Sequence, residues 1–348
     1  MDTRARLFLG TAISLILLVV VFRNTNWSEM LAALRGANYT LLALATLVTI
    51  GGVILRAFRW RALFWPETRL SLGALFDAVN VGYLANNLLP ARAGDVLRAY
   101  LAGEWARVGV AHALSTTVVE RVIDVLFVVA MLFSLLPFLP LPRPLVEAAL
   151  LVGAAFILAS AVLVGLSLQR ERGRRILARI LGLVPRLDAD LWSERLIALL
   201  DGFAILRAPG PLARVLAWSA IVWLEGIAVH VLTIRAFGLT SLPLATGVLT
   251  LCAAALGMAV PSAPSAAGTF HAAAYAVLLA FQVSDDRARA VAVALHAFNF
   301  VPLTILGFWS LARRGLSYRQ LAGRASRVAG QQPATEGAAP VQVATKEY

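Results

Sequence analysis

The sequence predicts an all-α polytopic membrane protein, with six spanning helices and two Pro/Gly-broken helical hairpins arranged as an inverted repeat. Of the 348 residues, 60% are apolar and only 14% are charged, whereas soluble domains average about 45–50% apolar and 25% charged residues. The mean hydropathy is +0.79. Several apolar runs reach the roughly 20 residues needed to cross a bilayer. Two long apolar regions are interrupted by proline and glycine.

The first predicted span is the apolar run 7–22, which follows Arg4 and Arg6. The residues after it lack the small side chains of a signal-peptide cleavage site, so we expect a retained anchor. Trp27 marks the next segment, 23–38, as interfacial. The other runs long enough to span are 39–57, 110–136, 145–168, 215–236 and 288–312.

Two regions, 70–108 and 243–282, do not read as simple spans because a Pro/Gly-rich segment divides each of them. In the first region, the second arm 95–108 is too short and too charged to cross, which predicts a re-entrant hairpin. For the second region, a hairpin and two complete crossings both remain open.

The distribution of basic residues predicts the orientation, because cytoplasmic loops are enriched in Arg and Lys. If both divided regions return to their starting side, 24 of the 30 basic residues outside the spans are cytoplasmic. If 70–89 crossed alone, about 10 would lie inside and about 20 outside. We therefore expect a multi-pass protein of the cytoplasmic (inner) cell membrane with both termini in the cytoplasm.

The chain divides into a membrane domain, 1–318, and a tail, 319–348, whose composition predicts disorder. Within the membrane domain, blocks 39–136 and 215–312 each contain a span, a divided pair and a second span, in opposite predicted orientations. Both hairpins break at the pattern Pro-x-x-Ala-Gly, 51 and 49 residues after the starts of their blocks. The basic segment 169–214 is predicted to be amphipathic and cytoplasmic.

The net charge of +12 raises the possibility of a nucleic-acid partner. In a membrane protein, arginine-rich loops are better explained by anionic lipid at the cytoplasmic face, so we expect no nucleic acid. Cys252 is the single cysteine, and the four histidines are scattered. This pattern predicts neither a disulfide framework nor a metal site, and no cofactor.

The interrupted helices favour transport, because broken helices in two inverted halves commonly form a substrate site at the membrane midplane. Pro90 and Pro264 open the two breaks, and Gly94 and Gly268 close them. A half-helix that begins after either glycine would direct unpaired N–H groups and a positive dipole end toward the site. Such an end suits a phosphate.

Charged residues within spans are functional candidates by default, because each costs about 2.5–3.5 kcal/mol at the helix centre. Glu120, Arg121 and Asp124 lie in the first half of the run 110–136. Glu120 and Asp124 share one helical face, and Arg121 can pair with Asp124 three residues on. The group is interpreted either as a structural ion pair between helices or as a substrate or proton-relay site.

Further charged candidates lie around the first break and in the run 215–236. Asp95 and Arg98 are three residues apart, and Arg92 lies at the hairpin tip. The arginines either anchor to lipid headgroups or grip a phosphate through bidentate hydrogen bonds. Glu225 lies near the middle of 215–236, where an isolated acid must pair or be protonated.

The remaining candidates are neutral side chains. Asn86 and Asn87 are expected to satisfy broken backbone near Pro90 or to contact substrate directly. His271 lies just inside the second half-helix, and Asn299 shares a face of the last span with His296. For that face, hydrogen bonding between helices is the expected role.

Three segments resemble one family. NNLLPARAGDVLR (86–98) and TVVERVID (117–124) are similar to its first signatures, and PSAPSAAGTFH (261–271) is similar to a later one, with departures at Ser265 and His271. The family is the flippase-like family, also called the lysylphosphatidylglycerol synthase transmembrane region. The resemblance covers roughly residues 5–315. It implies a polytopic membrane protein that flips aminoacylated or other polar lipids, and some members carry a soluble synthase domain that we do not expect here.

Together these observations predict a transporter-like protein that moves a polar, phosphate-bearing lipid or lipid-linked precursor between leaflets. Two other classes stay open. An accessory subunit would bind an envelope lipid or glycan synthesis enzyme and would need no polar interior. A membrane-embedded lipid transferase would need an acid/base pair, for which Glu120 and Asp124 are available. We favour a protein without enzymatic activity.

Overall fold

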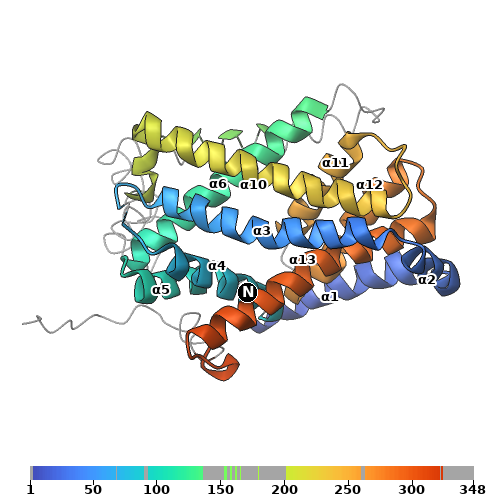
Figure 1. Cartoon of the computed structure of the whole chain (residues 1–348), viewed down its shortest axis with the longest axis horizontal. Helices are drawn as coiled ribbons and strands as arrows, with labels where there is room; N and C mark the ends of the chain where they lie inside the picture. Colours follow the sequence, from blue (N-terminus) through green and yellow to red (C-terminus); the bar gives the residue numbers. More distant parts are fainter. Residues whose placement is uncertain are drawn as a thin grey trace, which may run out of the picture.

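The computed structural model describes residues 3–67, 69–89, 93–135, 201–259 and 263–321, together with residue 323 and a few isolated positions between 153 and 179. Within these residues every regular element is helical, in agreement with the predicted all-α class; α3 and α10 run side by side, and α6 and α13 are inclined to them (Figure 1). The elements are α1 (Thr3–Phe22), α2 (Trp27–Arg35), α3 (Tyr39–Leu63), α4 (Leu72–Leu88), α5 (Gly94–Ala106), α6 (Val110–Leu135), η3 (Asp201–Arg207), α10 (Pro209–Ala236), α11 (Leu244–Ala259), η4 (Pro264–Ala266), α12 (Ala267–Ala280) and α13 (Asp285–Arg313).

Three helices, α3, α10 and α13, are long and apolar enough to cross a membrane, and they coincide with predicted spans. Helix α6 has 26 residues, but every stretch of it long enough to span contains Glu120, Arg121 and Asp124. Helix α1 also coincides with a predicted span. The predicted span 145–168 lies outside the described residues apart from isolated positions, as do most of 169–200 and the chain after residue 323.

Two helix boundaries differ from the prediction by six residues, the largest differences among the predicted spans that the structure describes. Helix α3 continues to Leu63, beyond the predicted end at residue 57, and α10 begins at Pro209, ahead of the predicted start at residue 215. The latter start is favourable because a proline in the first turn leaves no additional amide unpaired. Residues 318–321 are helical and Leu321 is fully buried, so the packed chain also passes the predicted start of the tail.

Helix α2 turns away from α1 by 88°, as expected for a segment that leaves a span to lie at the interface. The Asn26 side chain caps α2 by accepting hydrogen bonds from the amides of Ser28 and Glu29. Arg289 of α13 fixes the bend by donating to the Val21 carbonyl oxygen at 2.7 Å. Trp27 remains exposed.

The two predicted blocks pack in corresponding ways. Helices α3 and α10 are antiparallel neighbours, because the Asn38 amide donates to the Ala236 carbonyl at 2.7 Å and Phe58 stacks on Trp218 at 5.2 Å (Figure 1). When α3–α6 are exchanged with α10–α13, each contact among these helices corresponds to another observed contact. The pairs α3·α4 and α10·α11, α5·α6 and α12·α13, and α4·α13 and α6·α11 are examples. This is the packing expected of an inverted repeat.

Both divided regions form helical hairpins, in which α4 packs on α5 and α11 packs on α12. The glycine that closes each break has a packing role. A Cβ on Gly94 would collide with the Gly82 carbonyl oxygen of α4, and a Cβ on Gly268 would collide with the Ser14 carbonyl oxygen of α1. Helix α4 also contacts η4, which follows the second break. Helix α4 of the first hairpin therefore packs against the start of the second half-helix.

Candidate functional site

The first hairpin break is closed by a side chain of α4. The Asn86 side-chain oxygen accepts a hydrogen bond from the Gly94 amide at 2.9 Å, and Asp95 stands in the first turn of α5. Asn86 therefore satisfies broken backbone, which is one of its two predicted roles. The positive end of α5 is partly compensated within the protein itself. The predicted site residues Pro90 and Arg92 lie outside the described residues.

Arg98 of α5 connects the hairpin to the spanning helix α6. Its guanidinium donates to Glu120 Oε2 at 3.0 Å and lies 3.7 Å from the Asp95 carboxylate, the partner that the sequence spacing predicts. The indole of Trp60 covers one face of the guanidinium, with 4.9 Å from Cζ to the ring centroid. Arg98 and Glu120 are both buried.

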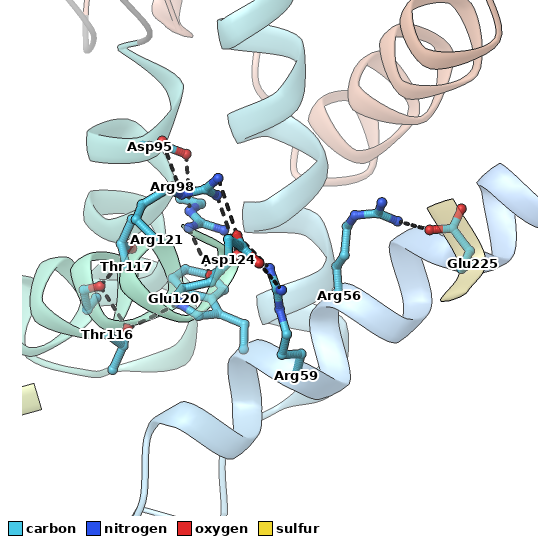
Figure 2. A network of polar contacts seen from close by, with 12 residues as sticks. Arg56, Arg59, Asp95, Arg98, Thr116, Thr117, Glu120, Arg121, Asp124 and Glu225 are labelled. Atoms are coloured by element: carbon cyan, nitrogen blue, oxygen red, sulfur yellow. Dashed lines mark hydrogen bonds and ion pairs between the residues drawn. The ribbon is translucent and has the colours of Figure 1, made fainter. Parts of the chain in front are cut away.

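Arg59 of α3 is the cation that the sequence analysis missed. Its Nη1 donates to Asp124 Oδ1 at 2.6 Å, and its Nη2 donates to Glu120 (Figure 2). Its side chain is only 3% exposed. The sequence analysis counted Arg56 and Arg59 among the cytoplasmic basic residues outside the spans. Two acids on one face of α6 were a signal that cations had to be supplied by a neighbouring helix.

The burial of Arg59, Arg98 and Arg289 also changes the charge count on which the orientation rests. None of the three lies in a loop. Without them the predicted cytoplasmic side holds 22 basic residues against 5 on the other side. The predicted orientation is therefore still favoured, and it stays a prediction.

Arg121 differs from the other arginines of the network because its contacts are long and its side chain is 45% exposed. It lies 3.4 Å from Glu120, 3.5 Å from Asp124 and 3.8 Å from Asp95. Arg59 and Arg98 hold the same carboxylates at shorter distances. Arg121 is thus the guanidinium that can exchange a carboxylate for another anion without leaving a buried acid unpaired.

Glu225 of α10 pairs with Arg56 of α3 at 2.9 Å, one helical turn from Arg59 (Figure 2). Gly52 makes room for this pair, because a Cβ there would collide with the Glu225 carboxylate. With this pair the network contains four arginines and four acids from α3, α5, α6 and α10: Arg56, Arg59, Arg98, Arg121, Asp95, Glu120, Asp124 and Glu225. Its formal charge is therefore zero.

The remaining predicted site residues lie away from this network. Asn87 donates to the Phe300 carbonyl at 3.3 Å and to Thr304 at 3.0 Å, so it joins α4 to α13. Asn299 donates to the Leu295 carbonyl of its own helix at 3.1 Å, and this hydrogen bond does not join two helices. The rings of His271 and His296 are tilted by 43° with centroids 4.7 Å apart, and His296 Nε2 lies 3.1 Å from the Ser265 carbonyl oxygen. Pro264 begins η4, and Gly268 packs on α1.

The fold and the network define a polytopic α-helical membrane protein with a charged interior beside a broken hairpin. The chain belongs to the family described as the lysylphosphatidylglycerol synthase TM region, whose model matches residues 7–307. It is a multi-pass membrane protein. The sequence resemblance to this family is confirmed.

Curated relatives are similar over most of the chain. Two UPF0104 membrane proteins of Methanothermobacter thermautotrophicus are 24% and 23% identical, covering 88% and 83% of this chain and 93% and 87% of their own lengths. A protein named glycosyltransferase AglD of Haloferax volcanii is 22% identical over 87% of this chain. The chain spans only 53% of that glycosyltransferase. No solved structure matches.

Proposed function

We propose that this protein translocates a polar, phosphate-bearing lipid or lipid-linked precursor between leaflets, in support of envelope lipid or glycan synthesis. The observation that carries the proposal is the network of four arginines and four acids beside the broken hairpin, in which Arg59, Arg98, Glu120 and Glu225 are buried. Charges inside a membrane protein are costly, and they commonly mark substrate or ion pathways. The names of the family and of the glycosyltransferase relative connect such chains to lipid or glycan synthesis.

Within this proposal Arg121 is the group that receives the phosphate. Its three carboxylate contacts are between 3.4 and 3.8 Å, so a phosphate oxygen can replace one of them at a shorter distance. Arg59 and Arg98 keep Glu120 and Asp124 paired during the exchange. Glu120 and Asp124 therefore keep a cation in both the free and the loaded state, and the bound phosphate gives the loaded site a net negative charge.

The hairpin supplies the moving part in this proposal. Helix α5 is linked to α6 by Arg98 with Glu120 and by Asp95 with Arg121. A phosphate that takes Arg121 weakens the second link and leaves the first intact. Substrate binding would thereby shift the hairpin relative to α6, because the ligand has different affinities for the two arrangements.

The arrangement favours binding over acid/base chemistry. Glu120 accepts hydrogen bonds from Arg59 and Arg98, and Asp124 accepts from Arg59. A general base needs a carboxylate oxygen within hydrogen-bond reach of the substrate proton. These oxygens are occupied by guanidinium groups.

Reconstitution into liposomes tests the proposal. Fluorescently labelled phosphatidylglycerol and labelled polyprenyl phosphate would be supplied in one leaflet, and their appearance in the other leaflet would be followed by chemical quenching. Translocation without a change in the lipid supports the proposal. A new lipid product would instead support a transferase. If neither translocation nor a new product were observed, an accessory subunit would be supported.

A matched pair of variants then assigns the site. Arg121→Gln is expected to reduce the rate of translocation at least about tenfold, because removing one charged hydrogen-bond donor costs roughly 1.5–3 kcal/mol. Arg35→Gln removes another exposed charge, at the end of α2, and should keep the rate of the unaltered protein. Equal rates for both variants would contradict the role of Arg121.

A further inference from the structure

A cavity lined by two arginines lies outside the network, where α3 ends and α10 begins. It has a volume of about 360 Å³ and is lined by Phe58, Arg61, Ala62, Trp65, Pro211, Arg214 and Trp218. No acid lines it. Volumes of this size accommodate small polar ligands.

The cavity is separate from the charged network because of helix geometry. Arg59 and Arg61 are two residues apart on α3, so their side chains leave the helix on nearly opposite faces. Arg59 is buried against Glu120 and Asp124, whereas Arg61 is partly exposed and lies at the cavity. A ligand at Arg61 would therefore not touch the network.

The two arginines of the cavity are available to an anion. Among the described residues neither Arg61 nor Arg214 forms an ion pair, whereas Arg56, Arg59, Arg98 and Arg121 all do. Arg61 lies over the ring of Phe58, with 5.4 Å from Cζ to the ring centroid. This contact positions the guanidinium without neutralising it. Two uncompensated guanidinium groups that line one small cavity match the charge of a phosphate, and the cavity volume leaves room for the rest of a headgroup.

The surroundings of the cavity indicate a lipid. Trp65 and Trp218 lie at its wall, and tryptophan is enriched at the level of lipid headgroups. On α3, Ile54 lies on the face of Phe58 and Arg61 and is 46% exposed, and on α10, Ile221 is 41% exposed. These apolar side chains continue from the cavity along the two helices, where acyl chains would lie.

We propose that this cavity binds the phosphate of an anionic phospholipid from the adjacent leaflet, with Arg61 and Arg214 on the phosphate and the acyl chains along α3 and α10. The site is independent of the proposed translocation site. The bound lipid would hold the end of α3 against the start of α10, and these are the first helices of the two blocks. Lipid composition would thereby act on the contact between the blocks.

Native mass spectrometry of the full chain in detergent tests the proposal directly. Delipidated protein would be titrated with phosphatidylglycerol, with phosphatidylcholine and with inorganic phosphate. We expect tighter binding of phosphatidylglycerol than of phosphatidylcholine, and no competition from millimolar phosphate. Full competition by inorganic phosphate would overturn the assignment to a lipid.

Variants with the same loss of charge separate this site from general surface charge. Arg61→Gln with Arg214→Gln is expected to weaken phosphatidylglycerol binding by about tenfold or more, since each basic residue near a membrane surface contributes on the order of 1 kcal/mol. Arg69→Gln with Arg107→Gln removes two exposed charges from loops at the same end and should change binding less than about twofold. Equal weakening by both pairs would show diffuse attraction and overturn the proposal.

Cross-linking of the unaltered protein provides a test that does not depend on the folding of variants. Phosphatidylglycerol with a photoreactive headgroup would be bound, irradiated and mapped by peptide sequencing. We expect labels within residues 58–65 and 211–218. Labels confined to other segments would contradict the site.

Discussion

The two hairpins share a backbone design but differ in chemistry. The α4–α5 hairpin is joined to α6 by ion pairs from Asp95 and Arg98. The α11–α12 hairpin is joined to α13 by rings, with Phe270 and His296 centroids 5.2 Å apart and His271 beside them. Each hairpin has a closing glycine that packs directly against a neighbouring helix.

This difference shows which features the hairpin fold requires and which are additional to it. Both hairpins form and pack, although among the described residues only the first is joined to its neighbouring spanning helix by ion pairs. The charges are therefore not required to make a broken hairpin at this depth, and their cost calls for another explanation. This reasoning supports a role in binding for the network of the first block.

Corresponding positions in the two blocks sharpen the comparison. Glu120 lies 81 residues after residue 39, and His296 lies 81 residues after residue 215, the two predicted block starts. Each contacts the hairpin of its own block, Glu120 through Arg98 and His296 through the Ser265 carbonyl. One position in the repeat thus joins a spanning helix to a hairpin with an ion pair in one block and with a neutral contact in the other.

The largest effect is expected from Arg59→Met, which leaves the buried carboxylates of Glu120 and Asp124 without their shared cation. Breaking a buried ion pair on one side costs about 3–5 kcal/mol. We expect a strong fall in the thermal unfolding temperature in detergent. Adding Asp124→Leu removes the pair as a whole and should recover most of the loss, while Glu120 keeps Arg98. An unchanged unfolding temperature for the single variant would contradict the network as described.

The closing glycines should respond alike in both hairpins. Gly94→Ala and Gly268→Ala each insert a Cβ into a backbone oxygen of a neighbouring helix. Such overpacking costs typically about 1–3 kcal/mol. Gly51→Ala is the control, because nothing lies within 4 Å of its added Cβ, and it should be neutral or slightly stabilising. A large effect in only one hairpin would break the correspondence between the blocks.

A smaller effect is expected from His296→Phe, which removes the polar contact to the Ser265 carbonyl while keeping a ring among Phe270 and Phe300. Loss of one such hydrogen bond costs about 1 kcal/mol. Lipid translocation should persist in this variant, as it should in His271→Phe. Inactivity of a stable histidine variant would move the functional site to the second block.

The smallest effect on stability is expected from Arg121→Gln, because its side chain is 45% exposed and its ion pairs are long. Half-exposed pairs of this kind contribute about 1 kcal/mol or less. Thermal unfolding should therefore change little, in contrast to the loss of translocation expected for the same variant. A destabilisation as large as that of Arg59→Met would instead assign Arg121 a structural role.

Local features of the fold could be predicted from the sequence because the bilayer requires apolar helices of a minimum length. Apolar runs of sufficient length located α1, α3, α6, α10 and α13 to within a few residues at most boundaries. The paired Pro-x-x-Ala-Gly pattern located both hairpins. The errors at Leu63 and Pro209 arose because a helix continues beyond its apolar stretch once other protein groups satisfy its polar side chains.

The candidate site was only half predictable. Spacing along one helix correctly paired Asp95 with Arg98 and Arg121 with Asp124. It could not supply Arg59, whose partners lie more than sixty residues away in the sequence. It also could not rank Arg121 as the loosely held cation, because exposure depends on neighbouring helices.

The sequence by itself determined that this protein is helical, lies in a membrane and contains two broken hairpins in matching blocks, because helix length, hydropathy and breaks are properties of contiguous residues. Tertiary structure alone decided which charges meet. Helices α3, α5, α6 and α10 bring four arginines and four acids together. A charge buried among helices must find its partner in space, and that partner need not be near it in the chain.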